Sequence, residues 1–152
     1  MAHILKQHIG YWINRLRMEV HQSFEHRLNA YDVTIAQWCI LASLYDQQAT
    51  SVNELASYIE VDKASVSRVV ERLVVKGLVS HSQGKDRRSG YLELTAEGQK
   101  LVPCLMNEAE QNEQRFFGQL TTTESVQFQN LVRKILTTLP SITLDEWLVP
   151  KE

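Results

Sequence analysis

Residues 51–95 read SVNELASYIEVDKASVSRVVERLVVKGLVSHSQGKDRRSGYLELT. Ser51 and Glu54 have the S-x-x-E spacing of a capping box, so a helix is expected to begin there. Asp62 is a good N-cap for a second helix, and Gly77 supplies a stop at its C-terminal end. The segment therefore predicts two short helices separated by a tight turn, followed by a different kind of structure.

The structure expected after the second helix is a β-hairpin. Residues 78–82 and 91–95 have the composition of short strands, and they bracket a basic, glycine-bounded tip at residues 84–90, GKDRRSG. A helix pair followed by such a hairpin suits a protein that lays one helix in the major groove of DNA and extends a wing alongside it.

The outward face of the second helix and the hairpin tip carry small or basic side chains, which are able to approach base edges and phosphates. These candidate DNA-binding residues are Lys63, Ser65, Ser67, Arg68, Arg72, Lys85, Asp86, Arg87 and Arg88. Any solvated helix or ordinary turn would show some of these features alone. Their order and short separation favour DNA binding.

The distribution of charge supports this interpretation. Seven basic and three acidic residues lie between Asp62 and Arg88, which makes that segment net +4, whereas the whole chain is net −2 and the remainder is therefore −6. The overall composition does not suggest a nucleic-acid partner, but the local asymmetry does. Nonspecific DNA packaging would normally favour a more basic chain.

Four stretches together resemble the MarR family of bacterial transcriptional regulators. They are TIAQWCIL at 34–41, the helix at 62–73, DRR at 86–88 and LTAEG at 94–98. The resemblance covers nearly the whole chain. It implies a homodimeric winged-helix regulator that binds a pseudo-palindromic operator in double-stranded DNA, often releasing it when a small ligand binds.

The resemblance also implies roles for individual residues. Arg88 matches the wing arginine that enters the minor groove, Asp86 matches the acid that orients the wing, and Arg68 sits where relatives have a recognition-helix arginine. Some relatives sense peroxides through a cysteine in the first helix. The corresponding position falls near Gly10 here, which does not support that mechanism.

Length and pattern indicate one domain over residues 1–152, mostly α with a small β-hairpin wing. We expect a winged helix-turn-helix lobe at about 32–98, flanked by dimerisation helices at about 3–30 and 99–140, whose apolar stripes need a partner. In the alternative to a dimer, these two flanking helical regions, which we call the arms, fold back onto the core of their own chain and the protein is a monomer. A cytoplasmic location without membrane association is expected, since the sequence contains no apolar run of spanning length and no signal segment.

The effector and its site are less well specified by the sequence. A small aromatic or phenolic effector could bind in an aromatic-walled pocket formed by Tyr11, Trp12, Arg15 and Trp38. An effector with a carboxylate would suit the positive charge of Arg15. Core packing explains the tryptophans equally well.

No catalytic motif, cofactor-binding motif or metal-ligand spacing is present, so an enzyme is not expected. Cys39 and Cys104 lie in apolar helix patterns and are expected to be buried. Two alternative functions stay open: a thiol-based redox-responsive regulator, and a winged-helix protein-interaction module that does not bind DNA.

Overall fold

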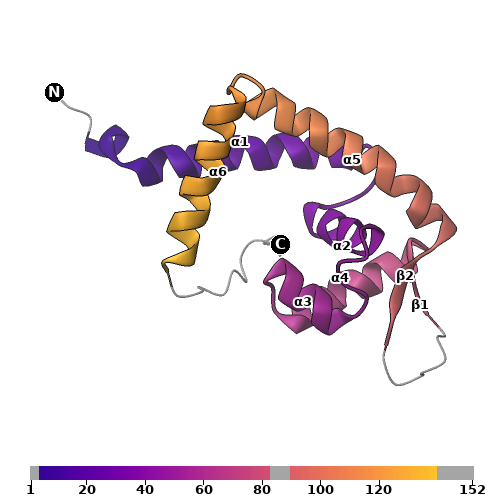
Figure 1. Cartoon of the computed structure of the whole chain (residues 1–152). Helices are drawn as coiled ribbons and strands as arrows, with labels where there is room; N and C mark the ends of the chain where they lie inside the picture. The colour runs from indigo at the N-terminus through magenta and orange to yellow at the C-terminus, as the bar shows by residue number, and fades with distance from the viewer. Residues whose placement is uncertain (1–3, 83–89, 140–152) are drawn as a thin grey trace.

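The computed structural model describes residues 4–82 and 90–139. The chain folds into helices and one small two-stranded sheet, which confirms the expected mainly helical class with a β-hairpin (Figure 1). In chain order the elements are η1 (Ile4–Gln7), α1 (Ile9–Asn29), α2 (Ile35–Tyr45), α3 (Val52–Ile59), α4 (Lys63–Val75), β1 (Val79–His81), β2 (Leu92–Leu94), α5 (Ala96–Phe117) and α6 (Thr122–Thr137).

Helices α2, α3 and α4 and the hairpin form a compact lobe with one apolar core. α2 is apolar on nearly every turn and lies at the centre of this core. Its start is fixed by Thr34 and Gln37, which exchange hydrogen bonds as a capping box. The buried apolar side chains of the core are Leu28, Val33, Ile40, Leu41, Leu44, Ala49, Leu55, Val66, Val70, Leu73, Val79, Leu92, Leu94, Val102 and Leu105.

The helix boundaries inside residues 51–95 follow the sequence signals. The Ser51 hydroxyl accepts from the Glu54 backbone N–H, as expected. The main hydrogen bonds of the Glu54 carboxylate are with Thr50, since it accepts from the backbone N–H of Thr50 at 2.7 Å and from the Thr50 hydroxyl at 3.0 Å. Those hydrogen bonds hold the pKa of Glu54 below its ordinary value. Gly77 ends α4 in the left-handed conformation, with φ at +73°.

The two strands pair antiparallel, with Val79 opposite Leu94 and His81 opposite Leu92. The Leu92 N–H donates to the carbonyl of Thr50 at 2.7 Å, so the chain entering α3 lies along the second strand. The hairpin is thus tied to the helix pair by backbone hydrogen bonds as well as by shared core residues.

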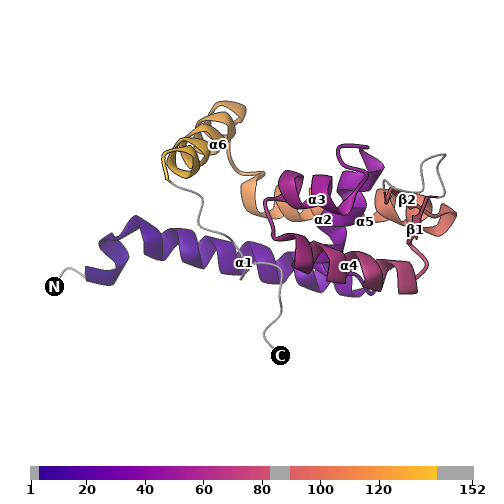
Figure 2. The same cartoon turned by 90° about the horizontal axis from the view of Figure 1, so that it is seen from below.

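α1 and α5 lie side by side and antiparallel (Figures 1 and 2). The lobe packs against the C-terminal end of α1 and the N-terminal end of α5. Arg27 donates to Glu108 and to Gln111, each at 3.0 Å, and the Asn112 amide donates to the Val20 carbonyl at 3.2 Å. Pro103 lies inside α5.

The apolar stripe of α1 is only partly covered. Leu28, at its C-terminal end, is fully buried, whereas Ile9 and Ile13 near its start are 75% and 47% exposed. α6 projects from the far end of α5, and its apolar residues Leu131 and Ile135 are also exposed (Figure 2). Among the described residues, no helix combines the length and apolarity that crossing a bilayer requires.

Candidate nucleic-acid interface

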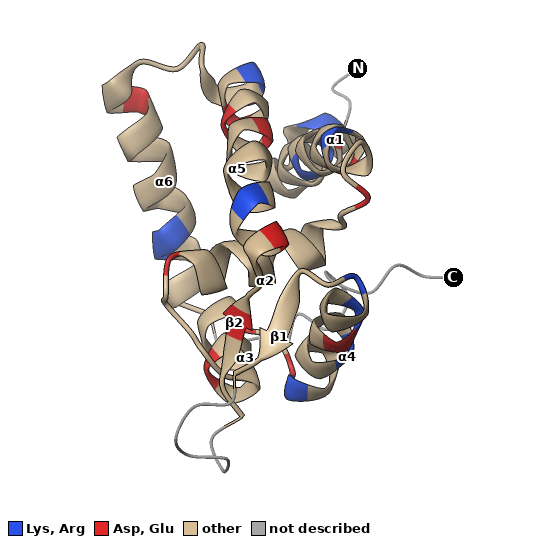
Figure 3. Cartoon of the chain, turned by 90° about the vertical axis from the view of Figure 1, so that its right-hand side faces the viewer, with Lys and Arg blue, Asp and Glu red and all other residues tan. Residues whose placement is uncertain are grey.

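α4 presents a polar, basic face to solvent because its apolar residues recur at three- and four-residue steps on the opposite side. Val66, Val70 and Leu73 are buried in the core of the lobe. The side chains at 63, 67, 68 and 72 are exposed, as the sequence pattern predicts. Figure 3 shows the basic positions along α4, on the outside of the lobe.

Ser65 does not share this exposure, so its assignment to the outward face was wrong. It is only 7% exposed, because it lies in the first turn of α4 on the side that packs against the lobe. Its backbone N–H donates to the N-cap carboxylate of Asp62 at 2.9 Å. Its hydroxyl accepts from the Arg68 guanidinium at 3.1 Å. Ser65 therefore fixes the start of α4 and orients Arg68.

The other two basic residues of this face are not engaged within the described residues. Neither Lys63 nor Arg72 makes a hydrogen bond or ion pair there, so their positive charges are available to an external anion.

Sequence reasoning missed two further members of the same face, Ala64 and Glu71, which are four positions before and three after Arg68. That helical spacing was the signal that could have identified them.

Glu71 connects this face to the hairpin. Its carboxylate lies 3.4 Å from Nε2 of His81 in β1, which places the hairpin directly beside α4. The ladder continues one step toward the tip, where the Ser82 N–H donates to the Tyr91 carbonyl at 2.7 Å. The four wing-tip candidates, Lys85, Asp86, Arg87 and Arg88, lie outside the described residues.

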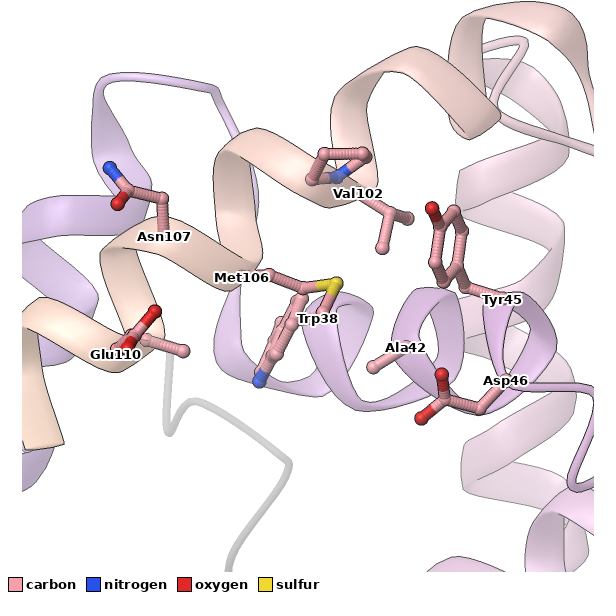
Figure 4. Close-up of a pocket in the computed structure, with 10 residues that line it drawn as sticks. Trp38, Ala42, Tyr45, Asp46, Val102, Met106, Asn107 and Glu110 are labelled. Atoms are coloured by element: carbon pink, nitrogen blue, oxygen red, sulfur yellow. The ribbon is translucent and has the colours of Figure 1, made fainter.

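A second feature is a cleft of about 580 Å³ where α2 meets α5. Figure 4 shows side chains from the two helices facing each other across it, with Trp38 beside Met106 at its centre. Asp46, at the end of α2, and Glu110, on α5, lie toward opposite ends. This volume falls within the range of about 300–1,000 Å³ that is usual for small-molecule sites.

Only one of the four expected pocket residues lines this cleft. Trp38 does, and its ring meets Phe24 edge to face with centroids 6.2 Å apart. Tyr11, Trp12 and Arg15 lie near the start of α1, which is about 30 Å long and extends beyond the lobe. The length of α1 separates these three residues from Trp38, so a single chain does not assemble the expected group.

The two cysteines differ in environment. Burial raises the pKa of the Cys39 thiol, as its position in an apolar helix predicted. Cys104 is exposed on α5, and the expectation that it is buried was wrong because α5 turns this position away from the core. Within residues 4–82 and 90–139, no three histidine, cysteine or acidic side chains come together as a metal site.

The sequence profile of the MarR family matches residues 31–89. The structure resembles that of Bordetella bronchiseptica BpsR, whose DNA binding is regulated by 6-hydroxynicotinic acid. The TM-score is 0.76 at 31% identity, over 89% of this chain and 98% of that one. It also resembles an Escherichia coli MarR variant complexed with operator DNA, with a TM-score of 0.74 at 25% identity, over 84% and 93% of the two chains. Pseudomonas putida NicR, a transcriptional repressor, is 28% identical over 86% of this chain and 83% of its own length.

Proposed function

This chain belongs to the MarR family of winged-helix transcriptional regulators, and we propose that it is a homodimeric repressor whose release from its operator is controlled by a small molecule. The observation that carries the proposal is the exposed basic face of α4 beside a hairpin that shares its core. The relatives named above are regulators rather than enzymes. A cytoplasmic location, where a bacterial chromosome is accessible, is part of the proposal.

On the operator, α4 is the element proposed to enter the major groove. Lys63 and Arg72 would neutralise phosphates, and Arg68 would reach a base edge or a phosphate from the first turns of the helix. The exposed Ser67 is small enough to allow close approach to the bases. The wing residues 85–88 would contact the neighbouring minor groove, as the resemblance to the family implies.

Dimerisation would use the exposed apolar surfaces of the two arms. The first half of α1 and the length of α6 expose large apolar side chains that a monomer leaves in water. A two-fold partner that covers them would set two α4 helices about 34 Å apart, which is one turn of DNA. The operator would then be an inverted repeat of about 16–20 base pairs with half-sites about 10 base pairs apart.

The cleft between α2 and α5 is the proposed effector site. It joins α2, at the centre of the DNA-binding lobe, to α5, which continues into the arm. An occupant that fits one arrangement of these two helices better than another shifts the equilibrium by its difference in affinity. This is how filling the cleft would alter the spacing of the two α4 helices.

The test starts from DNA fragments that the protein selects from a random library. Arg72→Ala and Arg68→Ala are compared with Lys100→Ala, which removes a positive charge from α5 away from α4. Each α4 variant is expected to weaken binding by about 1–3 kcal/mol, with the control near wild type. Equal binding by all four proteins, or failure to enrich any sequence, would contradict the proposal.

A further inference from the structure

The cleft between α2 and α5 has a carboxylate toward each end and no lysine or arginine among its lining residues. Its ten lining residues include Asp46 and Glu110 but neither lysine nor arginine. No described residue forms a hydrogen bond or an ion pair with either side-chain carboxylate. The cleft therefore has a charge of −2 from its walls, and a ligand carboxylate placed there would meet repulsion from both ends.

The backbone adds to this negative field. α2 ends at Tyr45, and its C-terminal end, which carries partial negative charge, opens at the same side as Asp46. The nearest basic residue along α5, Lys100, is directed toward Glu97, with Nζ 3.8 Å from the carboxylate. Arg15, which was expected to supply a cation for a carboxylate ligand, is on the distant half of α1.

The middle of the cleft is suited to a flat apolar body. The Trp38 indole and the Met106 thioether lie side by side there, and the Tyr45 ring forms part of the wall nearer Asp46 (Figure 4). Tryptophan attracts a cation over its face more strongly than the other aromatic side chains do. The Asn107 amide oxygen is an additional acceptor for an N–H donor.

From these contacts we propose that the cleft binds an organic cation with a flat aromatic body, packed against Trp38 and Met106, with its ammonium group beside Glu110 or Asp46. The inference rests on the proposed function, since it names the chemical class of the effector for the same cleft. It separates this chain from a relative regulated by 6-hydroxynicotinic acid, which is an aromatic acid.

Three probes of nearly the same shape test the choice of charge: 2-(aminomethyl)naphthalene, 2-(hydroxymethyl)naphthalene and 2-naphthoate. Their affinities for the DNA-free full-length protein are measured by isothermal titration calorimetry. The amine should bind about tenfold more tightly than the carboxylate, with the alcohol between them. The preference should shrink as salt is added, because the carboxylates are open to solvent.

Matched variants locate the effect. Glu110→Gln and Asp46→Asn should each weaken amine binding by about two- to fivefold, which is the range of a solvent-exposed ion pair. Glu113→Gln removes an equal charge from α5 outside the cleft and should change nothing. Tighter binding of the carboxylate, or an equal loss in Glu113→Gln, would overturn the inference.

Operator binding by the same preparations separates the two proposals. A protein that binds selected DNA but shows no preference for the amine contradicts the ligand class alone. A protein that prefers the amine but selects no DNA contradicts the proposed function and leaves the chemistry of the cleft standing.

Discussion

Gly98, in the first turn of α5, lies directly against the backbone carbonyl of Leu78, at the start of the hairpin. A Cβ at this position would overlap that carbonyl oxygen and would press on the Leu94 side chain at 3.3 Å. The neighbouring Thr95 strengthens the junction, since its N–H donates to the Leu78 carbonyl at 3.1 Å and its hydroxyl donates to the Gly77 carbonyl at 2.6 Å. The backbone of α5 and that of the hairpin are therefore in direct contact.

Gly98→Ala should destabilise the protein by about 1–3 kcal/mol, because the obstructing atom is backbone and cannot move without shifting the hairpin. Gly10→Ala is the matched control. Nothing lies within 4 Å of a Cβ there, so alanine at this position should not lower the stability. Urea unfolding of the three proteins measures both changes, and a Gly98 variant as stable as wild type would contradict the contact.

Ser65→Ala should weaken operator binding even though its side chain is buried, because Arg68 loses the hydroxyl that orients it. We expect a loss of about two- to fivefold, the value of one hydrogen bond. A double-mutant cycle with Arg68→Ala identifies the route. In the Arg68→Ala background the serine change should have no further effect, and two additive losses would mean that Ser65 acts independently of Arg68.

Glu54→Gln should lower stability at neutral pH and have progressively less effect in acid. The pKa of Glu54 is below its ordinary value, through its hydrogen bonds with Thr50, so its charged form favours the folded state. That contribution is present above the ordinary pKa of 4.5 and is lost as the pH falls through the lowered value. Stability measured from pH 7 to pH 3 should show the two proteins converging, with Glu113→Gln as the control. A gap of constant size would contradict this assignment.

The two cysteines should differ in reactivity toward a thiol reagent. Cys104 is exposed and should react quickly in the native protein, whereas Cys39 should react slowly because burial raises its pKa. Single serine variants show which cysteine gives the fast phase of the reaction and which gives the slow phase.

If a ligand alone controls DNA release, organic peroxide should leave operator binding unchanged in wild type and in the Cys39→Ser/Cys104→Ser protein. Release of wild type only would establish a redox switch.

If the chain dimerises as proposed, Ile135→Glu should convert the dimer to a monomer, because it places a charge on the exposed apolar face of α6. Asn130→Glu adds the same charge to the opposite side of that helix and should leave the dimer intact. Sedimentation equilibrium distinguishes the two, and circular dichroism checks that both variants fold. A wild-type monomer would contradict the proposed arms.

Local signals were sufficient for most of the winged lobe. The start and end of α4 were predicted from Asp62 and Gly77, and the hairpin from the strand-like residues on either side of its glycine-bounded tip. These signals were sufficient because helix caps and turns depend on residues that are close in sequence. Ser65 shows the limit of this reasoning. A serine on the boundary between two helix faces is equally consistent with contacting DNA and with packing inward, and only tertiary contacts decide. The cleft likewise depends on how α2 meets α5, two helices separated by 50 residues of chain, and no local pattern records that juxtaposition.

Pro103 lies between two segments of α5 that contact different parts of the molecule. Proline has no N–H, so the helix lacks one hydrogen bond at this point, and a proline is where a long helix bends most readily. Before Pro103, α5 is held to the hairpin at Gly98. After it, Glu108 and Asn112 bind the helix to α1. The weakest turn of the helix therefore lies between these two anchors, and Pro103 is itself part of the wall of the cleft. A molecule bound in the cleft would therefore contact α5 at the turn that lies between its anchor on the hairpin and its anchor on α1.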